Sequence, residues 1–375
     1  MKIEMVDLKG QYENMKDEIN CGIQQVLDST VFINGPQVKN FTAHLATYCN
    51  VEHVIPCANG TDALQIALMS LGLERGDEVI VPAFTYAATA EVVGLLGLTP
   101  VMVDVDYDSF NLTLENIRKA LTSKTRVVVP VHLFGQSCHM ESIMEFAREH
   151  QLFVVEDNAQ AIGADYTYSN GEKKKTGTMG TIGCTSFFPS KNLGCYGDGG
   201  ALMTHDDHLA EKIKMIANHG QKEKYHHSIL GCNSRLDTIQ AAVLDIKLKY
   251  LDHYNQIRHQ AAHYYSGHLN HIPGLITPAE SDFSTHVYHQ YTLKVLNGER
   301  DRLKRFLGEN DIPTMIYYPL PLQKQEAFQS IARVAGSLDV AEKLSCSVLS
   351  LPVHTEITRQ QQDFIINKIN EFYRI

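Results

Sequence analysis

The stretch V-V-V-P-V-H-L-F-G-Q-S-C-H-M-E-S-I-M-E-F-A-R-E-H-Q-L-F-V-V-E-D, from Val127 to Asp157, contains two short apolar runs separated by an amphipathic segment. The runs at 127–132 and 152–157 are rich in valine, which is typical of strands buried on both faces. The segment between them, Glu141 to His150, has helical periodicity. This order predicts two parallel strands joined by a right-handed helical crossover.

The same alternation extends over residues 54–201. Repetition of strand and helix predicts an α/β fold with a mostly parallel central sheet flanked by helices. We expect further strands at V-I-P-C (54–57), V-I-V-P (79–82) and P-V-M-V-D-V-D (100–106), and helices at 62–71, 89–96 and 114–121.

The chain after Ala201 has a different pattern, which predicts a smaller C-terminal α+β domain. We therefore divide the chain into a large domain at 1–250 and a small domain at 251–375. The apolar residues Ile19, Ile23, Val26 and Leu27 have helical spacing, so the N-terminal segment is expected to pack as a helix on one of the domains. We expect helices at 206–219, 235–269, 300–307 and 358–373, and strands at 286–295 and 312–319.

Composition excludes several classes of protein. The 375 residues are 44% hydrophobic and 20% charged, with a net charge of −10 and no long Lys/Arg run, so we expect no nucleic-acid partner. No apolar run has the length of a signal peptide or a membrane span, which favours a cytoplasmic protein with no membrane partner. The eight cysteines form no C-x-x-C pair and the eighteen histidines no H-E-x-x-H motif, so we expect reduced thiols and no metal site.

Several polar or aromatic residues follow the predicted strands, where parallel sheets bind ligands. Gly60 and Thr61 begin a helix, whose free N–H groups favour a phosphate. Tyr86 follows the second strand, and Asp157 ends a buried strand, where a carboxylate needs a cation. Caps and turns would explain some of these positions equally well.

Lys191 lies in S-F-F-P-S-K-N-L-G-C-Y-G-D-G-G-A, from Ser186 to Ala201. On its own this stretch fits either the wall of a pocket or a buried strand followed by a charged loop. An amine in an apolar setting has a lowered pKa and is suited to imine chemistry. Together, an amine, a buried acid, a flat aromatic and a phosphate cradle are what pyridoxal 5'-phosphate requires.

The chain resembles the DegT/DnrJ/EryC1/StrS family. Members of this family are fold type I, pyridoxal-phosphate-dependent aminotransferases that act on nucleotide-linked keto sugars. The resemblance covers nearly the whole chain. It rests on the motifs F-I-N-G-P, G-T-D-A-L, P-A-F-T-Y-A-A-T-A-E, E-D-N-A-Q-A-I-G-A, T-S-F-F-P-S-K-N-L-G, N-S-R-L-D-T-I-Q-A-A and I-Y-Y-P-L-P-L.

The resemblance implies a role for each matching residue. Lys191 would be the catalytic residue, which forms the imine with the cofactor and later moves a proton between the sugar carbon and the cofactor. Asp157 would pair with the pyridine nitrogen, Gln160 would meet the ring hydroxyl, and Tyr86 would stack on the ring.

The resemblance also implies how the phosphate is held. Its ligands would be the helix start at Gly60, Thr61 and Asp62, the hydroxyl of Ser186, and Asn233 from a neighbouring subunit. The protein would then be a homodimer with shared sites, and L-glutamate would be the amino donor.

The type of reaction and the sugar substrate are predicted from fewer residues than the cofactor site is. A lysine at 191 favours transamination, because related dehydratases carry histidine there, and a regulatory protein would have no reason to keep both Lys191 and Asp157. The motifs around H-G-Q-K-E-K-Y-H-H most resemble enzymes that aminate carbon 3 of a UDP-linked 2-acetamido-3-oxo-hexuronic acid in cell-surface polysaccharide or lipopolysaccharide biosynthesis. Arg235 suits the sugar carboxylate, although it could instead brace a helix or bind glutamate.

Other substrate contacts are less defined. Close hexuronate enzymes show a histidine followed by a tyrosine where this chain has Tyr317 followed by Tyr318. A dTDP-linked 3-keto deoxy sugar therefore stays open as the alternative substrate. A 4-keto sugar is less favoured. His226 and His227 either approach the substrate or belong to a solvated loop. His132 either lines the pocket or satisfies a backbone group.

Overall fold

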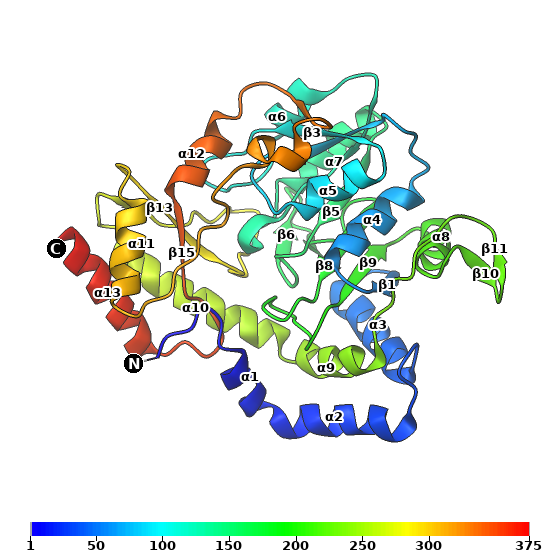
Figure 1. Cartoon of the computed structure of the whole chain (residues 1–375), viewed down its shortest axis with the longest axis horizontal. Coiled ribbons are helices and arrows are strands. Elements are labelled where there is room, and N and C mark those ends of the chain that lie inside the picture. The colour runs from blue at the N-terminus through cyan, green and yellow to red at the C-terminus, as the bar shows by residue number, and fades with distance from the viewer. Residues whose placement is uncertain (1, 375) are drawn as a thin grey trace.

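An eight-stranded sheet forms the centre of the larger part of the protein in the computed structural model, which describes residues 2–374 (Figure 1). Seven of the strands are parallel, and only β9 runs antiparallel to its two neighbours. The predicted mostly parallel sheet is therefore confirmed. The strand order is β1 (His53–Cys57), β9 (Gly200–Thr204), β8 (Ile182–Ser186), β5 (Phe153–Asp157), β4 (Thr125–Val128), β2 (Glu78–Pro82), β3 (Thr99–Val103) and β14 (Arg333–Val334).

The five predicted strands are all present, and two of them end earlier than expected. β4 ends at Val128 because Pro130 has no N–H to donate to the ladder; Val131 rejoins the sheet only as an isolated bridge to Asp157. β3 ends at Val103, and the Asp104 carboxylate beyond it accepts two backbone N–H groups from the start of a later helix.

Helices cover both faces of this sheet, as predicted. On one face α4, α5 and α8 pack against the strands, and on the other face α6 and α7 enclose a second apolar core. Their bounds match the predicted helices to within two residues: α4 (Gly60–Ser70), α5 (Ala88–Leu95), α6 (Leu114–Ala120), α7 (Met140–Glu149) and α8 (Asp207–Ala217).

The N-terminal segment is helical and packs on the large part of the chain, as expected. Ile19 is fully buried in a cluster with Val243 of α9, and Val26 is also buried. Leu27, in contrast, is 44% exposed. The helices of this region are α1 (Leu8–Asn14), α2 (Lys16–Ser29) and α3 (Pro36–Cys49).

The single helix predicted over 235–269 is wrong: the chain forms α9 (Thr238–Leu248) and α10 (Leu251–Leu269). At the junction, the N–H groups of Lys249 and Tyr250 bond three residues back instead of four, which ends the first helix. The two helices also differ in most of their packing partners. α9 packs on α2 and α3, whereas α10 lies under a second, smaller sheet.

The smaller sheet consists of β12 (Leu275–Ile276), β13 (Tyr291–Val295) and β15 (Val348–Leu351). Together with α10, the helices α11 (Arg300–Glu309) and α13 (Arg359–Tyr373) enclose its core, on the left of Figure 1.

Two predicted strands of the C-terminal part are corrected. Only 291–295 of the predicted strand 286–295 is extended in a sheet, because Val287 and Gln290 donate their N–H groups to Gly135 and Phe134 of the large part instead. Residues 312–319 form no strand beyond a single bridge at Met315.

The chain also returns from the smaller part to the central sheet. β14 extends that sheet, and α12 (Asp339–Ser347) packs on its core. The division at residue 250 therefore stays a prediction.

The remaining elements are the hairpins β6 (Asp165–Thr167) with β7 (Lys173–Lys175) and β10 (Gln221–Glu223) with β11 (His226–His227), and the single turns η1 (Leu133–Gly135), η2 (Leu322–Lys324) and η3 (Glu326–Phe328).

The eight cysteines, all in the described part of the chain, are unpaired, and five of them are buried. Within residues 2–374, no helix combines the length and apolar character needed to cross a bilayer.

Candidate active site

Asp157 is the last residue of β5, at the carboxyl edge of the central sheet, and is 6% exposed. Its Oδ2 accepts a hydrogen bond from the hydroxyl of Thr89 at 2.8 Å, and its Oδ1 accepts the N–H of Ala159 at 3.2 Å. Each carboxylate oxygen has two lone pairs, so capacity remains for a further donor. A buried carboxylate in this state is suited to hold a cationic N–H group.

Lys191 follows β8 in a tight turn, in which its N–H donates to the carbonyl of Phe188 at 2.8 Å. Burial lowers the pKa of its ammonium to about 8, although the nearby charge of Asp157 acts in the opposite direction. Across residues 2–374 its amine has no hydrogen-bond or ion-pair partner. A partly desolvated and unengaged amine is the form of lysine that attacks an aldehyde.

The tight turn around Lys191 depends on Gly194. A Cβ at this position would lie 2.3 Å from the carbonyl oxygen of Pro189, so only glycine lets the chain close on itself here.

The start of α4 lies against the end of β8. A Cβ on Gly60 would be 2.7 Å from the Cβ of Ser186, so glycine allows this close approach. Asn59 caps the helix by accepting the N–H of Asp62 at 2.8 Å, whereas the N–H groups of Gly60 and Thr61 have no acceptor among the described residues. The hydroxyl of Ser186 thus lies close to the free amides at the start of α4, an arrangement that suits a phosphate.

Gln160 connects the predicted ring site to the predicted substrate site. Its Oε1 accepts the N–H of Phe134 at 2.7 Å, and its Nε2 donates to the hydroxyl of Tyr318 at 3.1 Å. The ring of Tyr318 lies 6.3 Å from the ring of Tyr86, which is 61% exposed. Three residues predicted separately are therefore neighbours.

His289 lies near Lys191 and was not singled out from the sequence. It is 6% exposed, and its Nδ1 has no hydrogen-bond partner among the described residues. Burial and the nearby positive charges of Lys191 and Arg258 hold the pKa of His289 well below its usual value, so the ring is neutral. Its only sequence signal was its place in H-V-Y-H-Q-Y, which predicted a strand. Thr89, the donor to Asp157, gave no signal beyond its helix.

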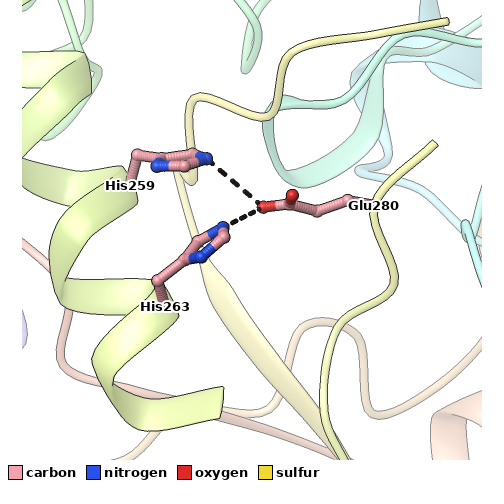
Figure 2. Close-up of side chains that lie close together, drawn as sticks. All are labelled: His259, His263 and Glu280. Atoms are coloured by element: carbon pink, nitrogen blue, oxygen red, sulfur yellow. Dashed lines mark hydrogen bonds and ion pairs between the residues drawn. The ribbon is translucent and has the colours of Figure 1, made fainter. Parts of the chain in front are cut away.

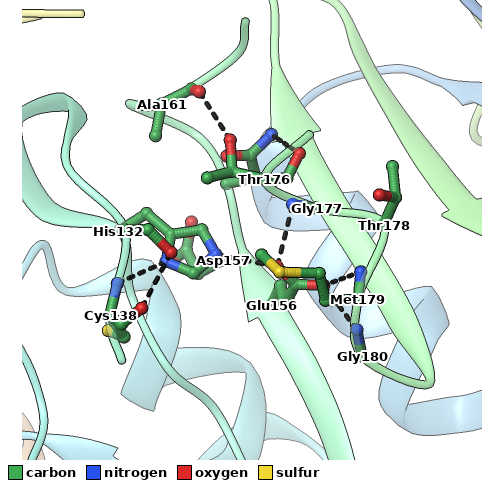
Figure 3. Close-up of polar contacts among 12 residues, drawn as sticks. His132, Cys138, Glu156, Asp157, Ala161, Thr176, Gly177, Thr178, Met179 and Gly180 are labelled. Atoms are coloured by element: carbon green, nitrogen blue, oxygen red, sulfur yellow. Dashed lines mark hydrogen bonds and ion pairs between the residues drawn. The ribbon is translucent and has the colours of Figure 1, made fainter. Parts of the chain in front are cut away.

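His132 does not contribute to this site (Figure 3). Its side chain has no exposed surface, its Nδ1 accepts the N–H of Cys138 at 3.1 Å, and its Nε2 lies 2.8 Å from Oε2 of Glu156. Of its two predicted roles, satisfying a backbone group is the one observed. The Glu156 carboxylate also accepts the N–H groups of Gly177, Met179 and Gly180 at 2.6 to 2.8 Å.

Three predicted contacts remain outward-facing in a single chain. Asn233 is exposed, and the Nδ1 of His227 lies 2.8 Å from the carbonyl oxygen of His219. His226 and His227 form β11, whose hairpin projects beyond α8 at the edge of the molecule (Figure 1). Arg235 is half-buried, and its guanidinium makes no ion pair or hydrogen bond with residues 2–374.

A parallel sheet with an amine, a buried acid and a phosphate cradle at its carboxyl edge defines a fold type I enzyme dependent on pyridoxal phosphate. The chain belongs to the DegT/DnrJ/EryC1/StrS aminotransferase family, whose model matches residues 13–370. It is a pyridoxal-phosphate-dependent sugar aminotransferase.

Known relatives cover nearly the whole chain. A protein named pleiotropic regulatory protein from Geobacillus stearothermophilus is 46% identical over 100% of this chain and 99% of its own. UDP-2-acetamido-2-deoxy-3-oxo-D-glucuronate aminotransferase from Pseudomonas aeruginosa is 44% identical over 94% and 95%. The solved structure of S. venezuelae DesV in complex with a ketimine intermediate has a TM-score of 0.94 and 39% identity over 100% and 99% of the two chains.

Proposed function

We propose that this enzyme transfers the amino group of L-glutamate to carbon 3 of a UDP-linked 2-acetamido-3-oxo-hexuronic acid, a precursor of cell-surface polysaccharide or lipopolysaccharide. The observation that carries the proposal is the guanidinium of Arg235, which is half-buried and has no partner within residues 2–374. In addition, the chain is 44% identical to an aminotransferase named for such a sugar. We also propose a cytoplasmic location, because no two cysteines are paired within residues 2–374.

The residues at the carboxyl edge of the sheet fit the cofactor. Pyridoxal phosphate, when bound, supplies an electron-accepting ring that stabilises the change of charge at the reacting carbon. In the proposed reaction the Asp157 carboxylate would stabilise a positive charge on the ring nitrogen. The hydroxyl of Thr89 donates to this carboxylate and orients it. The Lys191 amine would hold the cofactor through its aldehyde and, once the amino donor has displaced it, would carry a proton to or from the reacting carbon.

The other contacts position the cofactor. The free N–H groups of Gly60 and Thr61 and the hydroxyl of Ser186 would hold the phosphate, with Asp62 adjacent in the same helix turn. Gln160 would bind the ring hydroxyl, and the exposed ring of Tyr86 would stack on the cofactor ring.

Arg235 is proposed to bind the sugar carboxylate. An arginine that is half-buried without a partner loses hydration, and no group within residues 2–374 replaces it. A carboxylate would accept two parallel N–H bonds from its guanidinium, which is the geometry that arginine provides better than lysine. The same geometry would suit the glutamate carboxylate, so the two roles are separated by the substrate panel described below.

We also propose that the enzyme is a homodimer with shared active sites. Phe32 and Ile33 are each 44% exposed and run beside Asp237 and Thr238, just after Arg235. Leu230, in the segment that leads to Asn233, is 91% exposed. A second subunit would cover this apolar surface and bring Asn233 to the phosphate of its partner.

One feature favours the alternative substrate, a dTDP-linked 3-keto deoxy sugar without a carboxylate. Tyr317 stands at the position where a histidine is expected in close hexuronate enzymes, and Tyr318 next to it contacts Gln160.

A panel of nucleotide sugars with L-glutamate as donor tests the proposal. UDP-linked and dTDP-linked 3-keto and 4-keto sugars would be compared at equal concentration by the rate of amino-sugar formation. The UDP-linked 3-keto hexuronate should have the highest kcat/KM, and Arg235→Ala should remove that preference. Equal rates with and without the carboxylate would overturn the role of Arg235, and preference for the dTDP sugar would favour the alternative.

A further inference from the structure

A cluster of two histidines and a glutamate lies on the smaller part of the protein, outside the site described above (Figure 2). His259 and His263 are one turn apart on α10 and point toward Glu280, which lies in the loop between β12 and β13. The Nε2 of His263 is 2.9 Å from Oε1 of Glu280, and the Nε2 of His259 is 3.5 Å from the same oxygen.

The spacing of these atoms matches the needs of a tetrahedral metal ion. The three ligand atoms all lie within 4.8 Å of one another. A zinc ion binds histidine nitrogen and carboxylate oxygen at about 2.0–2.2 Å, which places neighbouring ligands about 3.3 Å apart in a tetrahedron. The two nitrogen–oxygen distances of 2.9 and 3.5 Å bracket that separation, so an ion would need only small side-chain shifts.

A neutral imidazole leaves one ring nitrogen free to bind a metal ion, and an ionised carboxylate supplies an oxygen ligand. The cluster therefore offers three ligand atoms of the kinds that zinc binds.

The carboxylate of Glu280 is also held in place by Tyr288, which is not itself a proposed ligand. The hydroxyl of Tyr288 donates to Oε1 of Glu280 at 2.6 Å, and the Tyr288 ring stacks on His286 with centroids 3.8 Å apart. Partners of this kind orient a ligand and raise metal affinity. His259 is partly exposed, and His263 and Glu280 are open to solvent, so an ion could reach the cluster from outside.

We propose that His259, His263 and Glu280 bind a divalent transition-metal ion of the zinc class, with water completing its coordination. Two imidazoles and one carboxylate select such ions over Mg²⁺ or Ca²⁺, which prefer oxygen ligands. The absence of H-E-x-x-H led us to expect no metal site. The ligands instead follow an H-x-x-x-H spacing, and the third comes from a loop seventeen residues further on, as the numbering shows.

The bound ion would act as a structural clamp. It would tie α10 to the loop that leads through Tyr288 to His289, and it would stabilise the folded state because the ligands converge only there. None of the three ligands belongs to the cofactor site, so the clamp does not depend on the proposed sugar. The other described cluster, Glu52, His53 and Asp207, offers only one nitrogen ligand and carries no such proposal.

Calorimetric titration of the chelator-treated holoenzyme with Zn²⁺ tests this site. The background would be Cys21→Ser/Cys346→Ser, which removes the two exposed thiols as competing ligands. We expect one ion per chain with micromolar or tighter affinity, and at least about tenfold weaker binding in His263→Ala and in Glu280→Gln. His268→Ala, an exposed histidine on the same helix, is the matched control and should bind as the parent does.

Thermal unfolding supplies a second readout. Zn²⁺ should raise the Tm of the parent and of His268→Ala, and leave the Tm of His263→Ala unchanged. Absence of zinc binding to the parent, or equal affinity in the parent and His263→Ala, would overturn the proposal. Co²⁺ should likewise give a tetrahedral absorption spectrum with the parent and none with His263→Ala.

Discussion

The side-chain amide of Gln160 donates a hydrogen bond to the hydroxyl of Tyr318 at 3.1 Å. Burial raises the pKa of Tyr318, so this hydroxyl stays protonated at physiological pH. Gln160 was predicted to contact the cofactor ring and Tyr318 to contact the sugar. Their bond therefore couples the two halves of the proposed site, and loss of one partner should affect both.

Tyr318→Phe tests this coupling. Removing the hydroxyl leaves the Gln160 amide without its acceptor, which costs about 1 kcal/mol, or about fivefold in affinity. We expect KM for the keto sugar to rise by about that factor and the visible absorption of the bound cofactor to shift. Tyr373→Phe, far along the chain in α13, is the control and should change neither value. Unchanged kinetics and spectrum in Tyr318→Phe would contradict the coupling.

Lys191→Ala tests the assignment of the catalytic amine. The variant should lose covalent attachment of the cofactor and at least about a hundredfold of its turnover, because no positioned group remains to move the proton. Absorption spectra and the rate of glutamate turnover measure the two effects. The exposed Lys249→Ala should behave as the wild type. Retention of both the visible band and turnover in Lys191→Ala would show that another residue is the catalytic lysine.

The lowered pKa of Lys191 predicts a pH dependence of stability in the cofactor-free protein. Burial places this pKa at about 8 in the folded state, whereas an unfolded chain has about 10.4. Between these two pKa values the unfolded chain binds more protons than the folded chain. The buried ammonium therefore lowers the free energy of unfolding by its full amount below about pH 8, and by less as the pH rises. Lys191→Met should therefore raise the free energy of unfolding near pH 7, and the gain should shrink toward pH 10. Urea denaturation at the two pH values measures it, and a gain independent of pH would refute the assignment.

Mixing of two inactive variants tests the shared sites. Lys191→Ala and Asn233→Ala chains, denatured together and refolded, would form heterodimers in which one site carries both changes and the other carries neither. About a quarter of wild-type activity should return in an equal mixture if Asn233 serves the partner's site. A control refolded from each variant alone should stay inactive. No recovery in the mixture, or a fully active monomer, would exclude sharing.

Much of the fold could be predicted because local periodicity and burial agree in this chain. The valine-rich runs form β2 to β5, and the residues just beyond them gather at one edge of the sheet. The exceptions have tertiary causes. The break at Lys249 and Tyr250 carries no proline or glycine, and most of α10 beyond it packs in a core that α9 does not reach. β8 and β9 were missed because their strand signals lie in stretches dominated by turn residues.

The candidate site was predictable where one ligand explains several residues. Lys191 and Gly60 lie in two separate motifs and Asp157 and Gln160 share a third, and the sheet topology brings the three motifs together. His289 was not predictable, because a buried histidine within an apolar run has the sequence pattern of a core position. Asn233 was predicted to bind the phosphate of a neighbouring subunit and His227 to approach the substrate, and both face outward in a single subunit.

The most direct test of the central claim is transfer of isotopically labelled nitrogen from L-glutamate to a UDP-linked 2-acetamido-3-oxo-hexuronic acid, followed by mass spectrometry. The wild type should place the label on carbon 3 of the sugar and release 2-oxoglutarate in equal amount, while Lys191→Ala should transfer none. Transfer to the dTDP-linked sugar alone would contradict the proposed substrate. Absence of label in every nucleotide sugar, with the cofactor fully bound, would contradict the proposed transfer from glutamate to a nucleotide-linked sugar.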